Sequence, residues 1–298
     1  MRYGRNLPLT MPGHTTDMRQ IDIRAMTRSE LDTVLDWAAE EGWNPGWQDA
    51  ASFYEADPGG FLLGSLDGEP VASIFAVQYG TSFGFIGGYI VRPAQRGRGY
   101  GMALWRAGMA RLAGRNVGLD GVPAQQDNYA RSGFRLAHRN VRYAGQGSGS
   151  LPDNGRVQLL TPADADEVIA YDRPFFPEHR SLFLRHWLQQ TGSIALGVRE
   201  GASLAGYAVL RPCRNGFKVG PLFADTPQLA EELLEAVQGR VPPQEPIFLD
   251  VPQPNAQAVA LAERHGMQPC FETARMYTGA DPALPLQRMY GITTFELG

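Results

Sequence analysis

Short apolar runs separated by turn residues dominate the first half of the chain. The segment "LLGSLDGEPVASIFAVQ" has two such runs around Asp67 and Gly68, a pattern that predicts a β-hairpin. The next run, Phe83–Val91, is aromatic and β-branched and predicts a buried strand. After it, apolar residues from Met102 to Leu112 recur every three or four positions and predict a helix with one apolar face.

Helix start signals occur at corresponding places in the two halves. Thr27 follows a short apolar run and has Glu30 three residues later, which predicts a capping box. Thr161 takes the corresponding place in the second half and is followed by Pro162, which suits the first helical position. The two helices are therefore expected to begin in the same way.

The whole succession of patterns repeats at a nearly constant offset. Gly201, in the turn expected at Glu200–Gly201, follows Gly68 at the same separation at which Gly266 follows Gly133. Each half is expected to read strand, helix, helix, hairpin, long strand, helix, strand, helix, strand. The prediction is an α/β fold with a mixed sheet, formed by two copies of a duplicated domain.

Residues 144–156, "AGQGSGSLPDNGR", lack an apolar period and are rich in Gly, Ser, Pro and Asn, as is typical of a linker. We therefore divide the chain into four segments. They are a loose leader (1–18), an N-terminal domain (19–145), a linker (146–155) and a C-terminal domain (156–298). We expect the two domains to dock on each other.

Composition excludes several classes of protein. The 298 residues are 43% hydrophobic and carry a net charge of −4, so we expect no nucleic-acid partner. No apolar run approaches the ~18 residues of a membrane span, so we expect no membrane partner. Cys213 and Cys270 have neither metal nor redox spacing, which predicts free thiols in the cytoplasm and no metal. No feature of the sequence indicates an oligomeric state.

The strongest chemical signal is the glycine-rich turn after the apolar run Phe83–Val91. Glycines at alternate positions, in "RGRGYG", lie between the expected strand and the N-terminus of the expected helix. Helix N-termini carry unpaired N–H groups and the positive end of the dipole, so this turn suits a phosphate group. A plain tight turn or a glycine-arginine RNA contact are the alternatives. The glycine spacing matches neither a Walker loop nor a dinucleotide fingerprint.

The turn also resembles the R/Q-x-x-G-x-G/A signature of the GNAT acyltransferases. Arg96, Gly99 and Gly101 occupy the signature positions, with Val91 and Pro93 upstream. The hairpin and the "YARSGF" segment resemble the same superfamily, so the chain is similar to two tandem GNAT-like domains. The segments "EGWNPG", "LDGVPAQ" and "YGITTFELG" resemble the bacterial tandem subfamily of the YitH/HolE type.

This resemblance implies a binding site for acetyl-CoA as acyl donor. The pyrophosphate would lie on the turn formed by Arg96, Gly97, Arg98, Gly99, Tyr100 and Gly101. The pantetheine arm would pair with the backbone of Tyr89, Ile90 and Val91, and an N–H near Ile90 or Val91 would stabilise the oxyanion. The thioester would reach the gap where this strand diverges from the next strand, "VGLDGV".

The resemblance further implies that Tyr129, in "YARSGF", is the acid that protonates the CoA thiolate. The alternative is a core aromatic. An asparagine that many relatives use to hold the pantetheine arm falls on Val122 here. For the general base, the candidates are Asp120 and Glu41, and the alternatives are water or an amine that arrives neutral. Asp250 repeats Asp120 in the second half, which also allows a structural role for Asp120.

The loop "EGWNPGWQDA" is the expected wall of the acceptor pocket. Trp43, Asn44 and Trp47 are the candidate acceptor-binding residues, although either tryptophan could instead pack between helices. The second half has lost the glycine turn and has Ala262 at the position of the acid, while Asn255 fits the asparagine position. We therefore expect a degenerate second half and one CoA site.

The predicted function is acetyl-CoA-dependent transfer of an acetyl group to the amine of a small molecule. Two alternatives stay open at this point: a non-catalytic protein that binds or senses acyl-CoA, and a protein or peptide N-acetyltransferase. The second half could approach the first through the segment "YDRPFFPEHRSLFLRHW", in which Phe175, Phe176, His179 and Arg180 are candidates for the contact.

Overall fold

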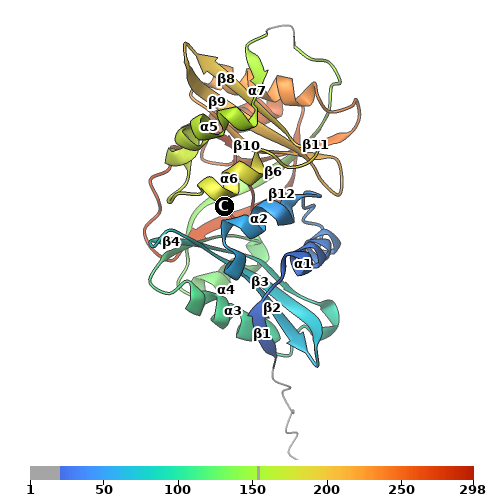
Figure 1. Cartoon of the computed structure of the whole chain (residues 1–298), viewed down its shortest axis with the longest axis vertical. Coiled ribbons are helices and arrows are strands. Elements are labelled where there is room, and N and C mark those ends of the chain that lie inside the picture. The colour runs from blue at the N-terminus through green and yellow to red at the C-terminus, as the bar shows by residue number, and fades with distance from the viewer. Residues whose placement is uncertain (1–20, 153–154) are drawn as a thin grey trace, which may run out of the picture.

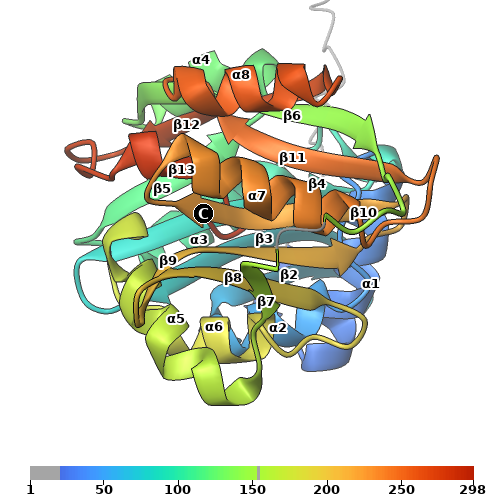
Figure 2. The same ribbon diagram turned by 90° about the horizontal axis from the view of Figure 1, so that it is seen from above.

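The computed structural model describes residues 21–152 and 155–298. The predicted leader, residues 1–18, lies outside the described residues. In the described part, the strands form one mixed 13-stranded sheet that runs through both halves, with helices packed on it (Figures 1 and 2). The predicted α/β class with a mixed sheet is confirmed.

The first half contains the predicted succession of elements. In chain order they are β1 (Asp22–Ala25), α1 (Arg28–Glu40), α2 (Asp49–Ala56), β2 (Phe61–Leu66), β3 (Glu69–Tyr79), β4 (Phe83–Val91), α3 (Tyr100–Arg111), β5 (Asn116–Gly121), α4 (Gln126–Arg131) and β6 (Arg135–Gln146).

The second half repeats this order and adds a last strand. Its elements are β7 (Val157–Leu159), α5 (Ala165–Asp172), α6 (Ser181–Trp187), β8 (Ile194–Glu200), β9 (Ser203–Pro212), β10 (Phe217–Ala224), α7 (Pro227–Gln238), β11 (Pro246–Pro252), α8 (Ala256–Arg264), β12 (Gln268–Tyr277) and β13 (Met289–Gly291). The sequence patterns did not predict β13.

Local sequence signals account for the start of α1 and for the first hairpin turn. The capping box of Thr27 and Glu30 is present, as is the positive φ of Asp67 and Gly68 that a two-residue hairpin turn requires. The second hairpin differs from the prediction by one residue. Glu200 still pairs with Ser203, so the turn consists of residues 201–202 rather than 200–201.

The two halves exchange their long last strands. β12 lies between β5 and β6 and pairs with both, while β6 pairs on its other side with β11 (Figure 2). Each of these two strands therefore completes the sheet of the other half. The predicted linker, residues 146–155, divides the sequence, but the hydrogen-bonded sheet contains strands from both sides of it.

A pair of buried ion pairs anchors the exchanged strands. Arg275 of β12 donates two hydrogen bonds, of 2.8 and 2.6 Å, to Asp120 of β5. Arg142 of β6 donates two, of 2.6 and 2.8 Å, to Asp250 of β11. The arginines are separated by the same offset as the repeated turn glycines, so the duplication has preserved the same pair in each half. Bidentate geometry of this kind fixes orientation as well as contact.

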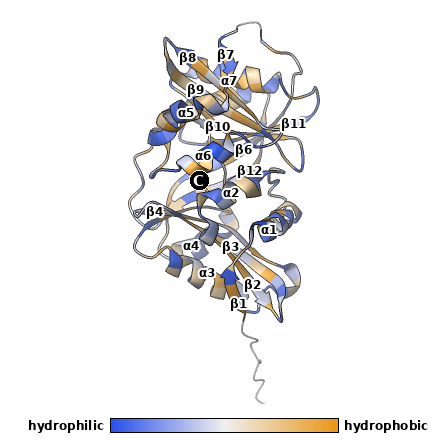
Figure 3. Cartoon of the chain, viewed as in Figure 1, coloured by the Kyte–Doolittle hydropathy of each residue, from blue (hydrophilic) through white to orange (hydrophobic). Residues whose placement is uncertain are grey.

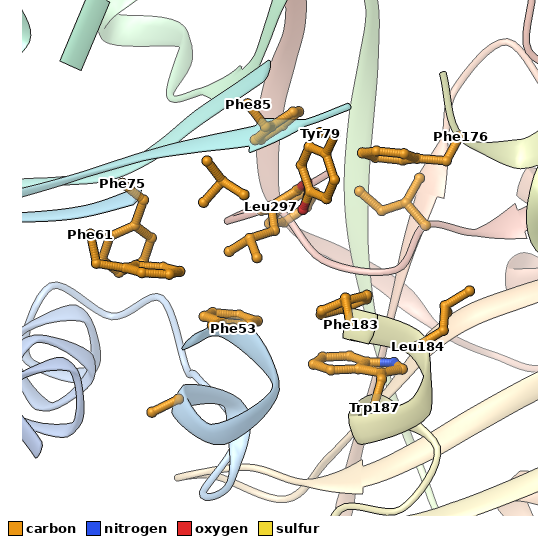
Figure 4. Close-up of a cluster of buried hydrophobic side chains, with 14 of the residues drawn as sticks. Phe53, Phe61, Phe75, Tyr79, Phe85, Phe176, Phe183, Leu184, Trp187 and Leu297 are labelled. Carbon is orange, nitrogen blue, oxygen red and sulfur yellow. The ribbon is translucent and has the colours of Figure 1, made fainter. Parts of the chain in front are cut away.

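The halves also share a hydrophobic core. Phe53 of α2 stacks on Trp187 of α6 with ring centroids 6.1 Å apart, and Tyr79 of β3 meets Phe176 at 4.6 Å (Figure 4). Leu297, near the end of the chain, lies in the same cluster. Of the four predicted contact residues, Phe176 touches the first half directly, whereas Phe175 stacks on Phe223 of its own half.

The helices carry their apolar side chains toward the sheet. Figure 3 shows polar and apolar residues on the same helices, as in α1 and α7. α3 packs against β3 and β4, and α7 packs against β9 and β10. Buried leucines such as Leu104 of α3 and Leu233 of α7 make these contacts hydrophobic. Each half is therefore built with the same layers.

Candidate active site

The site begins where β4 and β5 part. They pair in parallel only from Phe83–Asn116 to Phe85–Gly118, and both strands continue beyond this point. A bulge occurs in β4, where Gly88 adopts φ +52° and its carbonyl accepts a 2.9 Å hydrogen bond from Ser73 Oγ. The strand edge facing β5 is left without a strand partner, as the family resemblance implied.

Glycine is required at this bulge for two reasons. Its left-handed φ is unfavourable for other residues, and a Cβ on Gly88 would lie 2.5 Å from the ring of Phe75. The bulge therefore depends on close packing of β4 against β3, and it directs the backbone between Gly87 and Val91 toward the gap.

A cavity of about 390 Å³ fills the gap between the two strands. Residues 86–91 of β4 line one side, and Leu119, Asp120 and Gly121 of β5 line the other. Its remaining walls come from the loop after α1, from Arg96 and Trp105 on either side of the start of α3, from the segment between Val122 and Tyr129, and from the second half of the chain.

The glycine turn leads into the N-terminus of α3. Gly97 and Gly99 have φ of +76° and +85°, and Gly99 is the N-cap, so the cap residue provides no side-chain oxygen to the first helical N–H groups. A Cβ on Gly101 would collide with the hydroxyl of Tyr89. Tyr100 is buried in the core beneath the turn. The turn thus presents backbone N–H groups of a twelve-residue helix, which suits an anion.

The arginines of the turn are placed differently. Arg96 donates through Nε to the carbonyl of Val91 at 2.9 Å and pairs with Glu41. It therefore fastens the turn to the end of β4 and to the loop after α1. Arg98 is exposed, and no described residue forms an ion pair or hydrogen bond with it. Its charge is free to meet an anion at the turn.

Tyr129 lies on α4 and faces the cavity. Its ring packs 5.7 Å from that of Trp105 and lies directly on Gly121, where a Cβ would collide with it. Burial, with a smaller contribution from Tyr89, raises the pKa of the Tyr129 hydroxyl to about 12. The phenol therefore keeps its proton at neutral pH and can act as a donor.

The two candidate bases line the cavity but are both engaged. Asp120 is fully buried in its ion pair with Arg275, and its Oδ1 also accepts a 2.8 Å hydrogen bond from Asn140. Accepting a further proton would disrupt a buried pair, so this geometry favours a structural role for Asp120. Glu41 is held by Arg96 at the edge of the cavity.

The tryptophan loop is divided between the cavity and the contact with the second half. Trp43 lines the cavity. Asn44 instead exchanges two hydrogen bonds with the backbone of Asn215, of 2.9 and 2.8 Å. Trp47 is 53% exposed and lies under Arg214, 3.9 Å from its ring centroid, so neither of these two side chains faces the cavity.

Four residues of the second half also line the cavity, and none of them is a predicted site residue. They are Phe271 and Thr273 of β12 and Phe295 and Glu296 of the C-terminal segment. The exchange of strands brings the first two there. The segment "YGITTFELG" carries a family resemblance, but nothing in its local pattern indicates which cavity it reaches.

The corresponding gap in the second half is filled by the chain itself. β10 and β11 pair only from Phe217–Ile247 to Val219–Leu249, and β13 then pairs with β10 beyond this point. Asn255 donates a 3.0 Å hydrogen bond to the carbonyl of Met289 in β13. The asparagine that fits the pantetheine position thus holds a strand of its own protein.

Neither a metal cluster nor a membrane helix is found in the part of the chain that the structure describes. Residues 21–152 and 155–298 contain no group of three or more His, Cys, Asp or Glu side chains placed to bind a metal ion. In the same residues no helix has the length and apolar character needed to cross a bilayer.

Comparisons with known proteins agree with this architecture. The profile of the GNAT acetyltransferase family matches residues 28–134, and that of a GNAT acetyltransferase domain matches residues 168–291. A holothin acyltransferase from Pseudoalteromonas sp. (strain SANK 73390) is 30% identical over 269 residues, covering 90% of this chain and 92% of that protein.

Solved structures share the fold along most of the chain. A Pyrococcus horikoshii protein superposes with a TM-score of 0.78 at 21% identity, covering 100% of both chains. A tandem GNAT protein from the clavulanic acid biosynthesis pathway has a TM-score of 0.63 at 15% identity, covering 88% of this chain and 100% of that one. The chain belongs to the GNAT family of acyltransferases and carries two GNAT domains in tandem.

Proposed function

We propose that the protein is an acetyl-CoA-dependent N-acetyltransferase that transfers the acetyl group directly to the amine of a small molecule. One observation carries the proposal: the parted strands, the glycine turn and Tyr129 all border one cavity or its entrance in the first half. Acyl-CoA is a substrate in this reaction, not a resident cofactor.

Each part of the site would have a separate task. The N-terminus of α3 and Arg98 would hold the pyrophosphate. The unpaired edge of β4, with the backbone of Tyr89 and Ile90, would hold the pantetheine arm and place an N–H at the thioester oxygen. Tyr129 would protonate the leaving thiolate. The carbonyl of Val91 already accepts a hydrogen bond from Arg96, so it contributes less to the arm than its neighbours do.

The shape of the cavity supports a small acceptor. Its acceptor end is bounded by Trp43 of the first half and by Phe271 and Phe295 of the second half. A protein or peptide acceptor would need room for its chain on both sides of the amine, whereas aromatic side chains from both halves line this part of the cavity. The free thiols Cys213 and Cys270 are consistent with the reducing cytoplasm that we propose as its location.

Two measurements test the proposal. Isothermal titration calorimetry with acetyl-CoA should give one site per chain, because only the first gap is free of the chain's own strands. A library of small amines, with detection of released CoA thiol, should then identify an acceptor, and longer acyl-CoA donors would define the chain-length preference. Binding of acetyl-CoA without turnover of any amine or peptide would favour a sensing protein instead.

A further inference from the structure

The C-terminal segment connects the two gaps of the molecule. Directly after β13, Ile292 donates a backbone hydrogen bond of 2.9 Å to Asp250 of β11, so the segment starts in the filled gap of the second half. It then crosses to the first half, where Tyr79 donates a 3.2 Å hydrogen bond to the carbonyl of Leu297 (Figure 4). The carbonyl of Glu296 lies so close to Gly87 that a Cβ there would collide with it. The segment thus passes beside the β4 bulge.

This path places the Glu296 carboxylate at the acceptor end of the cavity. The residue is only 6% exposed, yet it lines the cavity. Its Oε2 accepts a hydrogen bond from Thr294 Oγ1, while no described residue donates to its Oε1. Burial with one oxygen unpartnered is costly for a carboxylate, so this oxygen is suited to a ligand.

The side chains around Glu296 include several buried cations. Three buried cations lie near it: Arg142, Arg211 and Lys218. Both arginines are already paired with carboxylates, Arg142 with Asp250 and Arg211 with Asp49. The Lys218 ammonium donates only to the carbonyl of Trp43, at 3.2 Å. Glu296 is thus the third carboxylate of this buried group, and unlike Asp120 it forms no direct ion pair with any described cation.

On the cavity side, Glu296 has the hydroxyl of Thr273 and several aromatic rings as neighbouring lining groups. Thr273 is 2% exposed, and its Oγ1 has no hydrogen-bond partner among the described residues. Trp43, Phe271 and Phe295 line the same end, and the two phenylalanine rings lie 6.0 Å apart. Aromatic faces attract both flat apolar groups and cations.

We propose that Glu296, delivered by the degenerate half, binds the ammonium group of the acceptor and takes its proton, and that the acceptor is an aryl-bearing primary amine. The aryl group lies against Trp43, Phe271 and Phe295, and Thr273 Oγ1 provides a second polar contact. This inference rests on the proposed transferase function and specifies its base and its class of acceptor.

The proton balance of the step is complete. The ammonium R–NH₃⁺ gives one proton to Glu296 Oε1, and the resulting amine nitrogen attacks the thioester carbonyl carbon. The new C–N bond forms, the C–S bond breaks, and the nitrogen loses a second proton. One proton reaches the thiolate through Tyr129, and one leaves for solvent as Glu296 is regenerated. The products are the amide, the CoA thiol and a released proton.

Benzylamine, which is an ammonium at about pH 7, and aniline, which is neutral there, are the probes. With acetyl-CoA as donor, Glu296→Gln should lower kcat/KM for benzylamine roughly 10²-fold, as is typical when a general base is removed. Its effect on aniline should be small, because aniline needs no deprotonation before attack. Binding of benzylamine to the CoA-saturated protein should weaken roughly 10-fold, while acetyl-CoA affinity stays unchanged. Glu235→Gln, an exposed carboxamide variant on α7, should match the wild type in every measurement.

A double variant separates catalysis from charge balance. Glu296→Gln leaves Lys218 without a compensating charge and is expected to lower the melting temperature. Lys218→Met combined with Glu296→Gln removes both charges, so it should recover stability without recovering benzylamine turnover. Recovery of turnover with stability, or an equal loss for benzylamine and aniline, would overturn the assignment.

The outcomes also distinguish this inference from the proposed function. If the wild type binds benzylamine through Glu296 but acetylates no amine, the transferase proposal fails while the ammonium site stands. If the wild type binds no benzylamine but acetylates another amine from the library, the transferase proposal stands and the aryl-ammonium inference is overturned.

Discussion

The gap between β4 and β5 and the gap between β10 and β11 arise in the same way, but only the second is filled by another strand of the chain. In each half a long strand pairs briefly in parallel with the next strand and then parts from it. The gap in the first half contains a cavity and is followed by a glycine turn. The gap in the second half contains β13, and the helix beyond it is capped by the side chain of Thr226. The first gap therefore has room for a ligand, whereas in the second gap the edge of β10 is already paired with β13.

This difference shows how the second half can contribute to a cavity in the first half. A strand edge needs a hydrogen-bonding partner, and β13 provides in the second half what a pantetheine arm would provide in the first. The residues after β13 then continue into the first half and form part of the cavity wall. The segment that fills the gap of one half thereby also lines the cavity of the other.

The largest expected effect comes from the two buried ion pairs. Asp120→Asn and Asp250→Asn should each lower the free energy of unfolding by about 3–5 kcal/mol, because each leaves a buried arginine without its partner. Denaturant unfolding measures this loss. The kcat of folded Asp120→Asn should change no more than that of Asp250→Asn. A stable Asp120→Asn protein with a selective loss of kcat would instead identify Asp120 as the base.

Two glycines, Gly87 and Gly220, test the two places where the C-terminal segment packs closely against a strand. Gly87 and Gly220 occupy equivalent positions in the two halves, and a Cβ on either would collide with a carbonyl of that segment, of Glu296 or of Thr293. Alanine at either position should cost about 1–3 kcal/mol of stability through overpacking. Gly87→Ala should also lower kcat, since it displaces Glu296, whereas Gly220→Ala should leave the kcat of the folded protein intact. Equal effects on kcat would show that the segment acts only as a structural element.

Tyr129 is the next test, because the second half has Ala262 at the corresponding position. Tyr129→Phe keeps the ring on Trp105 and removes the proton donor, so kcat should fall roughly 10- to 10²-fold with little change in melting temperature. Its pKa of about 12 lies above neutral pH, so the phenol loses its proton only as the pH rises toward 12. The wild-type kcat should therefore show no decline from this group between about pH 7 and 10. An unchanged kcat would make Tyr129 a packing residue.

The smallest expected effect concerns the free charge at the glycine turn. Arg98→Glu should weaken acetyl-CoA binding roughly 5- to 10-fold at low salt, and the effect should shrink as salt rises, because the site is exposed. Arg106→Glu, which is also exposed and lies in α3 beyond its first turn, is the control with the same change of charge. Calorimetry that finds equal affinities for the two variants would place the pyrophosphate elsewhere.

The sequence by itself determined the features that depend on near neighbours. The order of strands and helices followed from apolar periodicity, the start of α1 from Thr27 and Glu30, and the first hairpin from Asp67 and Gly68. The parting of β4 from β5 was also expected, from the family resemblance. These features are readable because caps and turns are decided by residues a few positions apart.

Only the tertiary structure decided which segments meet. The apolar pattern of β6 is as compatible with pairing to β5 as with the observed pairing to β11, so the exchange of β6 and β12 has no local signal. β13 is only three residues long, which is too short for the alternation of apolar and polar residues in a strand to be recognised. The position of Glu296 at the cavity depends on the strand exchange and on β13. The C-terminal segment leaves β13 in the second gap and continues to Gly87 of β4. Strand periodicity says which face of a strand is buried, but the choice of neighbour depends on edges and side chains far away in the sequence.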